Sequence, residues 1–491
     1  MAALRPPGGG PDAAIRSILQ ALVRAGSVDA ALAAARGAGL DADALRPELE
    51  RLAGIDRLLA EDHEIPALLR ALDGRWIAPA PGGDLLRTPE VLPTGRNVYG
   101  FDPFRVPSAF ATREGRRQAE RLLERHRADH GRLPETVAMV LWGTDNMKSE
   151  GAPIAQAMAL LGAAPRFDSY GRLAGAELLP LDELGRARVD VVLTLSGVFR
   201  DLLPLQTRML AEAAALAAAA DEPDALNPVR RHARETAAAL GCTPEEAALR
   251  VFGNAEGAYG ANVNNLVESG RWSDEEELAE TFVRRKAFAY GPGASAQAAP
   301  ALFRRALAGA ELAFQNLDSV ELGVQDVDQY FDGLGGMSRA VRRERGEAVP
   351  TYVGDSTRGE ARVRTLAEQV ALETRTRTLN PKWYEALLRH GYEGVRQVES
   401  RVTAALGWSA TTGEVPQWVY TQTTRVFVLD AEMRGRLADL NPAAASRMAG
   451  RLLEANERGY WTPDDDTLDA LRRAADELED RLEGITPEAA A

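Results

Sequence analysis

Four polar residues stand at the ends of apolar runs that have the composition of buried strands: Asp145, Ser196, Asn316 and Asp355. Parallel strands end together along one edge of a sheet, and ligands bind beyond that edge, so we expect these side chains to converge on a ligand site. Carboxylate and amide oxygens suit a hard cation such as Mg²⁺. For each carboxylate taken alone, a helix cap or an ion pair is the alternative role.

The elements that must position these side chains follow from hydrophobic patterning. Near-continuous apolar runs at Thr136–Trp142 and Val189–Leu195 enclose a segment with helical spacing at 154–161, and the runs at 312–318 and 350–355 end like two further strands. This alternation predicts an α/β fold in which a parallel sheet, flavodoxin-like or Rossmann-like, forms layers with helices on both faces. Helical N- and C-terminal regions flank it.

The chain divides by composition into four predicted segments. An Ala/Leu/Arg-rich beginning and an amphipathic end predict helices, and a Pro/Gly-rich stretch after residue 73 predicts loops and turns. The segments are a helical region at 1–72, a loop segment with an Arg-rich helix at 73–131, one or more α/β domains with the predicted cavity face at 132–393, and a helical region at 394–491.

Charge and cysteine content exclude several classes. The net charge of −14 over 491 residues argues against nucleic-acid binding and is compatible with basic partners. The single cysteine, Cys242, excludes an internal disulfide and a multi-cysteine metal site. No apolar run approaches the ~18 residues of a membrane span, and the first residues lack a signal-peptide pattern, so we expect a cytoplasmic protein.

Sequence motifs remove other enzyme classes. The chain has no Gly-x-x-x-x-Gly-Lys-Ser/Thr motif, so we expect no ATP binding through a P-loop. It also lacks a His-Glu-x-x-His zinc motif and a Gly-x-Ser-x-Gly nucleophile elbow.

Some residues are unusual for their rarity or clustering. The Asn/Gly-rich stretch at 251–265 can hydrogen-bond a polar ligand edge, or can supply loop and cap contacts only. Lys148, Lys286 and Lys382 are the three lysines among 58 basic residues. Lys148 and Lys382 lie inside polar motifs, where ligand contact and compositional accident are both open. His390 lies near a predicted helix C-terminus, which favours its charged form.

Several motifs in a fixed order give the chain a family resemblance. They are Leu141–Asn146, Leu195–Asp201, Phe314–Asp318, Val363–Leu366, Leu379–Trp383 and His390–Gly394. In this order they resemble the porphyrin-binding large-subunit family of magnesium chelatase and cobaltochelatase, from about Asp73 to Gly484. The stretches Asn316–Leu322, Gly407–Gly413 and Glu457–Trp461 resemble the magnesium branch more than the cobalt branch. Gln329 departs from the family, which often has a His there.

The resemblance implies a role in ATP-dependent insertion of Mg²⁺, a substrate, into protoporphyrin IX for chlorophyll or bacteriochlorophyll biosynthesis. Two separate ATPase-type subunits are the implied users of ATP. Family members are considerably longer, so the chain corresponds to a carboxy-terminal part, and the missing N-terminal half of the large subunit is an implied partner. The alternatives are a cobaltochelatase large subunit that inserts cobalt into a corrinoid precursor, and a non-catalytic tetrapyrrole-binding or docking fragment.

Residue type and family motif together give the predicted site. A carboxylate or His390 is the implied proton acceptor, and Arg200 is suited to pair with a propionate. The predicted catalytic residues are His390, Glu393 and Asp355. The predicted porphyrin-binding residues are Arg200, Asn254, Asn316 and Lys382. The predicted metal-binding residues are Asp145 and Asp201.

Overall fold

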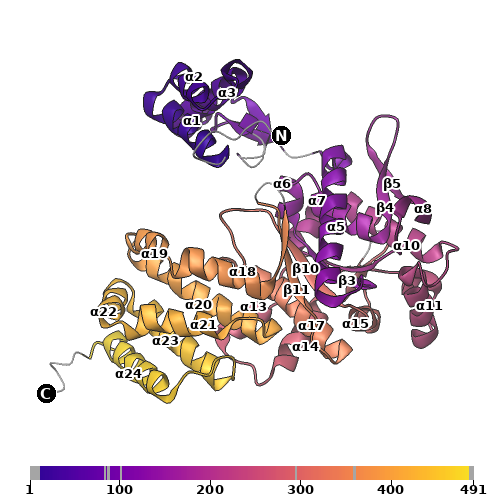
Figure 1. Ribbon diagram of the computed structural model, residues 1–491. Coiled ribbons are helices and arrows are strands. Elements are labelled where there is room, and N and C mark those ends of the chain that lie inside the picture. Colours follow the sequence, from indigo (N-terminus) through magenta and orange to yellow (C-terminus); the bar gives the residue numbers. More distant parts are fainter. Residues whose placement is uncertain are drawn as a thin grey trace. The chain divides into compact units, whose positions relative to one another are not determined.

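The structure is a computed structural model that describes residues 11–81, 85, 89–99, 102–293, 296–357 and 361–485. It comprises two compact units, residues 1–102 and residues 103–491, so the boundary falls inside the loop segment predicted at 73–131. Each unit is described by itself (Figure 1).

The first unit is a small helical bundle with a short two-stranded sheet. Its helices bury Ile18, Leu22, Leu32 and Leu49 against one another. Strand β1 pairs in parallel with β2. The elements are α1 (Pro11–Ala25), α2 (Val28–Gly37), α3 (Ala42–Ala60), α4 (Glu64–Leu72), β1 (Pro79–Pro81), η1 (Pro89–Val91) and β2 (Asn97–Tyr99).

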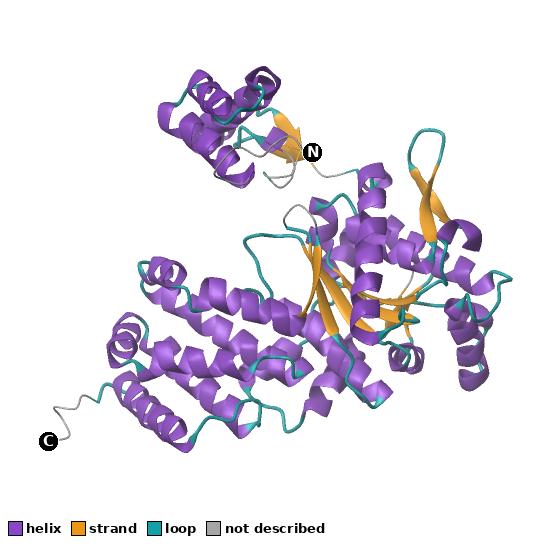
Figure 2. Ribbon diagram, viewed as in Figure 1, coloured by secondary structure: helices purple, strands orange, loops and turns teal. Residues whose placement is uncertain are grey.

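The second unit is built around an eight-stranded sheet in the order β12-β11-β10-β3-β6-β7-β8-β9. Five central strands are parallel: β3 (Thr136–Leu141), β6 (Asp190–Leu195), β7 (Val251–Gly253), β10 (Leu312–Leu317) and β11 (Thr351–Asp355). The remaining strands, β8 (Phe288–Tyr290), β9 (Ala296–Ala298) and β12 (Arg362–Thr365), are antiparallel to their neighbours. Figure 2 shows this sheet in orange.

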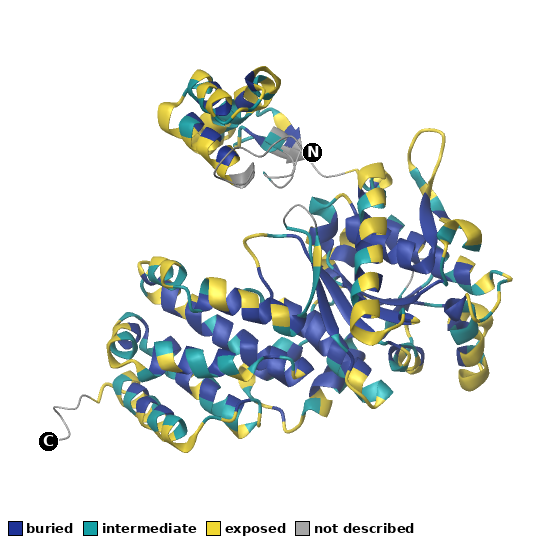
Figure 3. Ribbon diagram, in the orientation of Figure 1, coloured by how far each residue is buried: buried dark blue, intermediate teal, exposed yellow. Residues whose placement is uncertain are grey.

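Helices cover both faces of this sheet, as a parallel sheet requires. Every residue of β3, β6 and β10 is buried, which explains their continuous apolar sequences (Figure 3). The helices α5 (Ala109–His130), α7 (Ala152–Leu161) and α10 (Pro204–Ala219) lie on one face, and α14 (Glu275–Lys286), α15 (Pro300–Ala308) and α17 (Gly336–Arg345) lie on the other (Figure 1). The predicted α/β fold class is therefore confirmed.

Short elements connect these layers. They are η2 (Pro103–Arg105), α6 (Gly143–Lys148), the antiparallel pair β4 (Ala163–Phe167) and β5 (Leu173–Leu178), α8 (Leu181–Leu184), α9 (Gly197–Leu202), α11 (Pro228–Leu240), α12 (Pro244–Ala247), α13 (Val263–Ser269), α16 (Asp328–Tyr330) and the π-helical turn η3 (Phe331–Gly335).

The end of the chain is helical and shares one apolar core with the sheet. Trp408 and Trp461 are fully buried, and the Trp408 indole donates to the carbonyl of Val324 at 2.8 Å. The elements are α18 (Leu366–Glu373), η4 (Thr374–Thr378), α19 (Pro381–Leu388), α20 (Tyr392–Thr412), α21 (Gln417–Thr424), η5 (Arg425–Leu429), α22 (Ala431–Leu440), α23 (Pro442–Glu457) and α24 (Asp465–Leu482).

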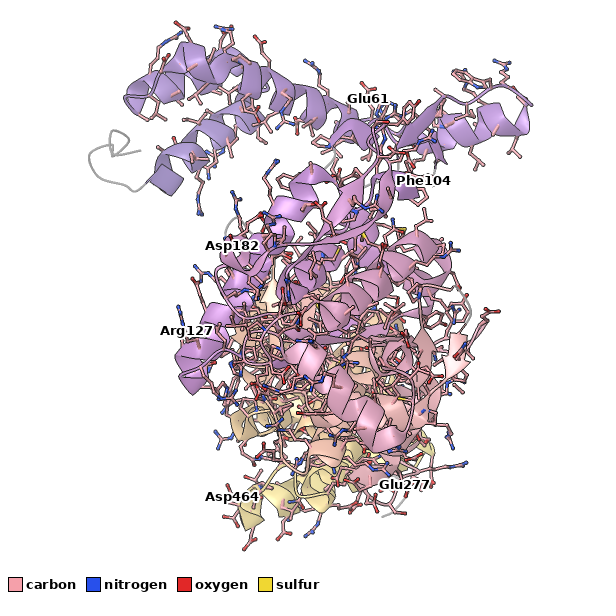
Figure 4. All side chains as sticks on the ribbon, turned by 90° about the vertical axis from the view of Figure 1, so that its right-hand side faces the viewer. Glu61, Phe104, Arg127, Asp182, Glu277 and Asp464 are labelled. Carbon is pink, nitrogen blue, oxygen red and sulfur yellow. The ribbon has the colours of Figure 1, made fainter. Side chains whose placement is uncertain are left out.

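Charged side chains form the outer surface. Arg127, Glu277 and Asp464 are exposed, and Figure 4 shows these three at the periphery of the second unit. Among the described residues, no helix combines the length and the apolar character needed to cross a membrane.

Candidate functional site

The connections of the sheet place a crevice between β3 and β10. From β3 the chain continues to β6 on one side, whereas from β10 it continues to β11 on the other. Right-handed crossovers put the connecting helices on opposite faces, so the loops after β3 and β10 diverge at the carboxyl ends of the two strands. Ligands of open α/β sheets bind at such a point.

A pair of carboxyl groups, Asp145 and Asp318, lies at this crevice. The two residues are 4% and 8% exposed, and their carboxyl groups lie close enough for the charge of Asp318 to act on Asp145. Burial is the main cause that raises the pKa of Asp145, and the charge of Asp318 raises it further, to about 8. Two carboxylates this close cannot both ionise easily, so near neutral pH the pair holds a proton.

A cavity of about 300 Å³ adjoins this pair. It is lined by Val140, Trp142, Gly143, Thr144, Thr194, Ser196, Gly197, Val198, Tyr259, Gly260, Lys286, Leu322, Val327, Gln329, Tyr330, Asp332 and Gly333. The Thr144 hydroxyl donates to Asp145 at 3.4 Å, which connects the carboxyl pair to the cavity wall. Five lining residues are exposed: the apolar side chains Val198, Leu322 and Tyr259, and the polar side chains Thr144 and Gln329.

Aromatic rings form part of the cavity wall. Trp142 and Tyr330 meet edge to face, with ring centroids 5.4 Å apart, and the Trp142 indole donates to Gln315 at 3.0 Å. Burial and then the nearby carboxylates Asp145 and Asp318 raise the pKa of Tyr330, so its phenol stays protonated. A Cβ on Gly333 would lie 2.9 Å from the Trp142 ring, so only glycine leaves room for the indole here.

Ser196 and Asn316 lie at the same edge of the sheet and are held by protein groups. The Ser196 hydroxyl accepts from the backbone N–H of Phe199 and of Gly143, both at 3.1 Å, so it caps α9 and ties it to α6. The Asn316 amide donates to Gln156 at 2.7 Å. These contacts fix the shape of the edge.

Asp355 ends the neighbouring strand β11 and is also engaged. It accepts from the Thr357 hydroxyl at 2.6 Å and pairs with Arg364 at 2.5 Å. Burial favours a higher pKa for this carboxyl, but the Thr357 and Arg364 bonds outweigh burial and lower the pKa. Asp355 therefore stays ionised.

Arg200 and Asp201 organise the loop at 254–260. The Arg200 guanidinium donates to the carbonyls of Ala255 and Ala258, at 2.6 and 2.9 Å, and pairs with Asp201 at 2.7 Å. The Tyr259 hydroxyl donates to Asp201. The bond from Arg200 is the main cause that lowers the pKa of Asp201.

Lys286, which lines the cavity, forms a second polar centre together with Asn254. Lys286 is 5% exposed, and its ammonium donates to the carbonyl of Leu195 at 3.0 Å and to Asn254 at 2.8 Å. Asn254 is held in turn by its bond to the carbonyl of Gly260 at 2.8 Å. Burial is the main cause that lowers the pKa of Lys286, to about 8.

Lys382, His390 and Glu393 lie away from this edge. All three are exposed, on α19, just after it and at the start of α20. Glu393 pairs with Arg396 at 2.6 Å, one helical turn away on the same helix. The structure thus brings Asp145, Ser196, Asn316 and Asp355 to one edge, and it does not bring these three residues there.

Metal binding has a limited set of donors. In the described part of the chain, no three or more His, Cys, Asp or Glu side chains are grouped so as to hold a metal ion. Asp145 lies beside Asp318, whereas Asp201 is bound by Arg200 and Tyr259, so the two predicted metal ligands belong to different clusters.

The family model for CobN/Magnesium Chelatase matches residues 12–468, which is most of the chain. The chain belongs to the CobN/magnesium chelatase family. The predicted resemblance is therefore confirmed.

Several relatives place the chain within this family. It is 60% identical to the magnesium-chelatase H subunit of Rhodobacter capsulatus over 447 residues, covering 91% of this chain and 37% of the relative. It is 44% identical to the chloroplastic magnesium-chelatase ChlH subunit of Oryza sativa subsp. indica, covering 91% and 32%. The chain thus spans about a third of the length of these relatives.

The cobalt branch is more distant in sequence but has the same fold. Identity to the aerobic cobaltochelatase CobN subunit of Sinorhizobium sp is 39%, covering 82% of this chain and 32% of the relative. The solved catalytic subunit of cobaltochelatase from Mycobacterium tuberculosis superposes with a TM-score of 0.89 at 38% identity, covering 96% and 40%. The cobaltochelatase alternative is therefore not favoured.

Two residues of the site in this CobN/magnesium chelatase family member were missed by sequence reasoning. Asp318 follows β10 directly, but a linear pattern does not show that its carboxyl group meets that of Asp145, 173 positions away. Lys286 ends an ordinary amphipathic helix. The only available signal was the scarcity of lysine, which also marks Lys148 and Lys382.

Proposed function

We propose that this chain is the carboxy-terminal part of a magnesium chelatase large subunit, and that the edge at β3, β6 and β10 forms one wall of the site where protoporphyrin IX receives Mg²⁺. The 60% identity to the magnesium-chelatase H subunit supports the substrate and the metal. The exposed apolar side chains of Val198, Leu322 and Tyr259 suit contact with a flat, largely apolar macrocycle.

The carboxyl pair carries the chemical part of the proposal. Metal insertion requires removal of two pyrrole N–H protons from the macrocycle and loss of water from a reluctantly dehydrating ion. A base works best when its pKa lies near the operating pH, and burial brings Asp145 to about 8. In this proposal the fraction of the Asp145–Asp318 pair that is fully ionised near this pKa accepts one pyrrole proton, and Thr144 and Tyr330 line the cavity beside the pair.

The other predicted residues take supporting roles in this proposal. Ser196, Asn316 and Asp355 use their polar atoms within the protein and shape the edge. Arg200 and Asp201 hold the loop that carries Tyr259. His390, Glu393 and Lys382 stay predictions that the arrangement of the edge does not use.

In the proposal, ATP is used by two ATPase-type subunits. The chain spans 37% of the length of its Rhodobacter relative, and the rest of the large subunit completes the site. A second candidate function is the binding of a tetrapyrrole without turnover, which the cavity of about 300 Å³ with its exposed apolar side chains supports.

Removing one carboxylate while keeping its shape tests the proposal. The purified chain, supplied with the amino-terminal half, the ATPase-type subunits, ATP, Mg²⁺ and protoporphyrin IX, should form Mg-protoporphyrin. Asp145→Asn and Asp318→Asn should each lower the insertion rate by about 10²-fold or more, the usual contribution of a general base. Porphyrin affinity, measured by fluorescence quenching, should stay within about twofold because binding does not need the base.

A matched control is Asp224→Asn, since Asp224 pairs with Arg234 on the surface. Equal insertion rates in the control and in both pair variants would contradict the assigned base. Binding without insertion by the wild-type mixture would favour the second candidate function.

A further inference from the structure

Lys286 presents a buried positive charge without a matching negative one. Its ammonium has three N–H donors, and two of them bond to neutral oxygens, those of Leu195 and Asn254. Within the described ranges no carboxylate forms an ion pair with it. Burying an ammonium without a counter-charge is costly, so this position favours an anion that arrives from outside.

Asp332 is the carboxylate whose charge acts on Lys286, but its oxygens already accept hydrogen bonds from other groups. Asp332 acts on Lys286 through its charge but has no hydrogen bond to it. Its two oxygens accept from the backbone N–H groups of Ala261 and Val263, at 2.6 and 2.7 Å. Asp332 therefore fixes the loop at 261–263 instead of neutralising the lysine.

The size and lining of the cavity beside Lys286 limit which anionic ligands can reach the ammonium group. Lys286 lines the cavity of about 300 Å³, together with Trp142 and Tyr330. This volume is at the lower end of the ~300–1,000 Å³ typical of pockets that hold a whole ligand. Three of the exposed lining side chains are apolar, Val198, Leu322 and Tyr259, of which Tyr259 is 53% exposed. The cavity thus suits one carboxylate-bearing edge of a larger apolar molecule.

We propose that Lys286 is an anchor for a carboxylate of the ligand, and that in the magnesium chelatase role this carboxylate is a propionate of the porphyrin. The inference rests on the proposed function and adds the residue that orients the macrocycle. Asn254 acts as a positioning residue, because its amide oxygen holds the lysine and its amide nitrogen is fixed by Gly260.

Two other cations fit this role less well. The Arg200 guanidinium bonds two backbone carbonyls through Nη1 and Asp201 through Nε, and Arg200 does not line the cavity. Lys382 is exposed on α19, which packs on α20 and η4 and makes no part of the cavity.

Esterification of the ligand tests the anchor without changing the protein. Fluorescence quenching is titrated on the whole chain with protoporphyrin IX and with its dimethyl ester, which has the same ring but no negative charge. The diacid should bind about tenfold more tightly, since hydrogen bonds to charged groups contribute more than neutral ones.

Lys286→Met keeps the length and apolar stem of the side chain and removes the charge. In this variant the diacid should weaken to the affinity of the ester, and the ester should bind as it does to the wild type. Arg284→Met is the matched control, since it removes one positive charge from an exposed position of the same helix and should keep the tenfold difference. Circular dichroism of each variant verifies folding.

Each outcome separates the two proposals. Equal binding of diacid and ester by the wild type, or a tenfold difference that survives in Lys286→Met, would overturn the anchor and leave the proposed function intact. Failure of the wild type to bind either porphyrin would overturn the proposed function, and the anchor with it. If Lys286→Met does not fold, the wild-type comparison of diacid and ester decides alone.

Discussion

Two buried aspartates at opposite edges of the same sheet have pKa values that are shifted in opposite directions. Asp190 begins β6 at the amino edge, where Arg250 pairs with it at 2.7 Å and His232 Nδ1 lies 3.0 Å away. Burial favours a higher pKa for Asp190, but Arg250 and His232 outweigh it and lower the pKa to about 2. Asp145 follows β3 at the carboxyl edge, meets another acid and has its pKa raised to about 8.

The contrast separates structural charge from reactive charge. At the amino edge every charge of the Asp190 cluster has a partner, which is how folded proteins usually retain buried ions. At the carboxyl edge, Asp145 and Lys286 keep poorly compensated groups beside a cavity. Perturbed acids and bases gather at functional sites, so this asymmetry supports placing the chemistry at the carboxyl edge.

The largest predicted effect is a loss of stability caused by a substitution at the amino edge of the sheet. Asp190→Ala leaves the Arg250 guanidinium buried without its partner and should lower the free energy of unfolding by about 3–5 kcal/mol, measured by urea denaturation. Asp224→Ala, which breaks the surface pair with Arg234, should cost less than about 1 kcal/mol. Similar costs for the two variants would remove the structural role of the Asp190 cluster.

The pH dependence of stability should have opposite signs at the two edges. Between the ~3.9 of an unfolded aspartate and the value of about 8 for folded Asp145, the folded protein holds a proton that the unfolded chain has released. The contribution of Asp145 therefore falls as pH rises through this window, by at most about 1.4 kcal/mol per pH unit. Asp145→Asn should thus gain in stability relative to the wild type as pH rises.

Asp190 should behave in the reverse way. Its lowered pKa of about 2 contributes stability that is fully present above about pH 4 and is lost as pH falls toward 2. The destabilisation of Asp190→Asn should accordingly shrink on acidification. Urea unfolding across this range measures both trends, and parallel pH profiles for the two variants would contradict the comparison.

The smallest effect is expected in the helical region, outside both edges. His390 is exposed after α19, so His390→Ala should leave the rate of metal insertion within about twofold of the wild type, because the base assigned here is the Asp145–Asp318 pair. A loss as large as that of Asp145→Asn would instead establish His390 as a catalytic residue, as its sequence motif predicts.

The sequence predicts the sheet more fully than the site. The runs at 136–142 and 189–195 differ by about one residue from β3 and β6, because strands buried on both faces need continuous apolar side chains. The edge that gathers Asp145 and Asn316 follows from parallel topology alone. Contacts across that edge, such as Asp145 with Asp318, depend on the order and register of strands that are distant in sequence.

Residues with suitable polar groups also differ in whether those groups are available to a ligand or are already bonded within the protein. Arg200 and Asn254 lie near the cavity in a region predicted to bind ligand, but their polar atoms hold the backbone and Lys286. Lys286 stands on a helix without any local signal of function. Only packing distinguishes a polar group that stabilises a loop from one that remains available.

The intrinsic fluorescence of Trp142 can report on ligand binding in the cavity. Among seven tryptophans of the chain, Trp142 is the one that lines the cavity. A tetrapyrrole bound there absorbs at the wavelengths where tryptophan emits. Energy transfer should therefore quench the fluorescence of Trp142 most strongly. The Trp142→Phe variant keeps the other six tryptophans and serves as the reference. The difference in quenching between the wild type and this variant then reports occupancy of the cavity without an attached dye.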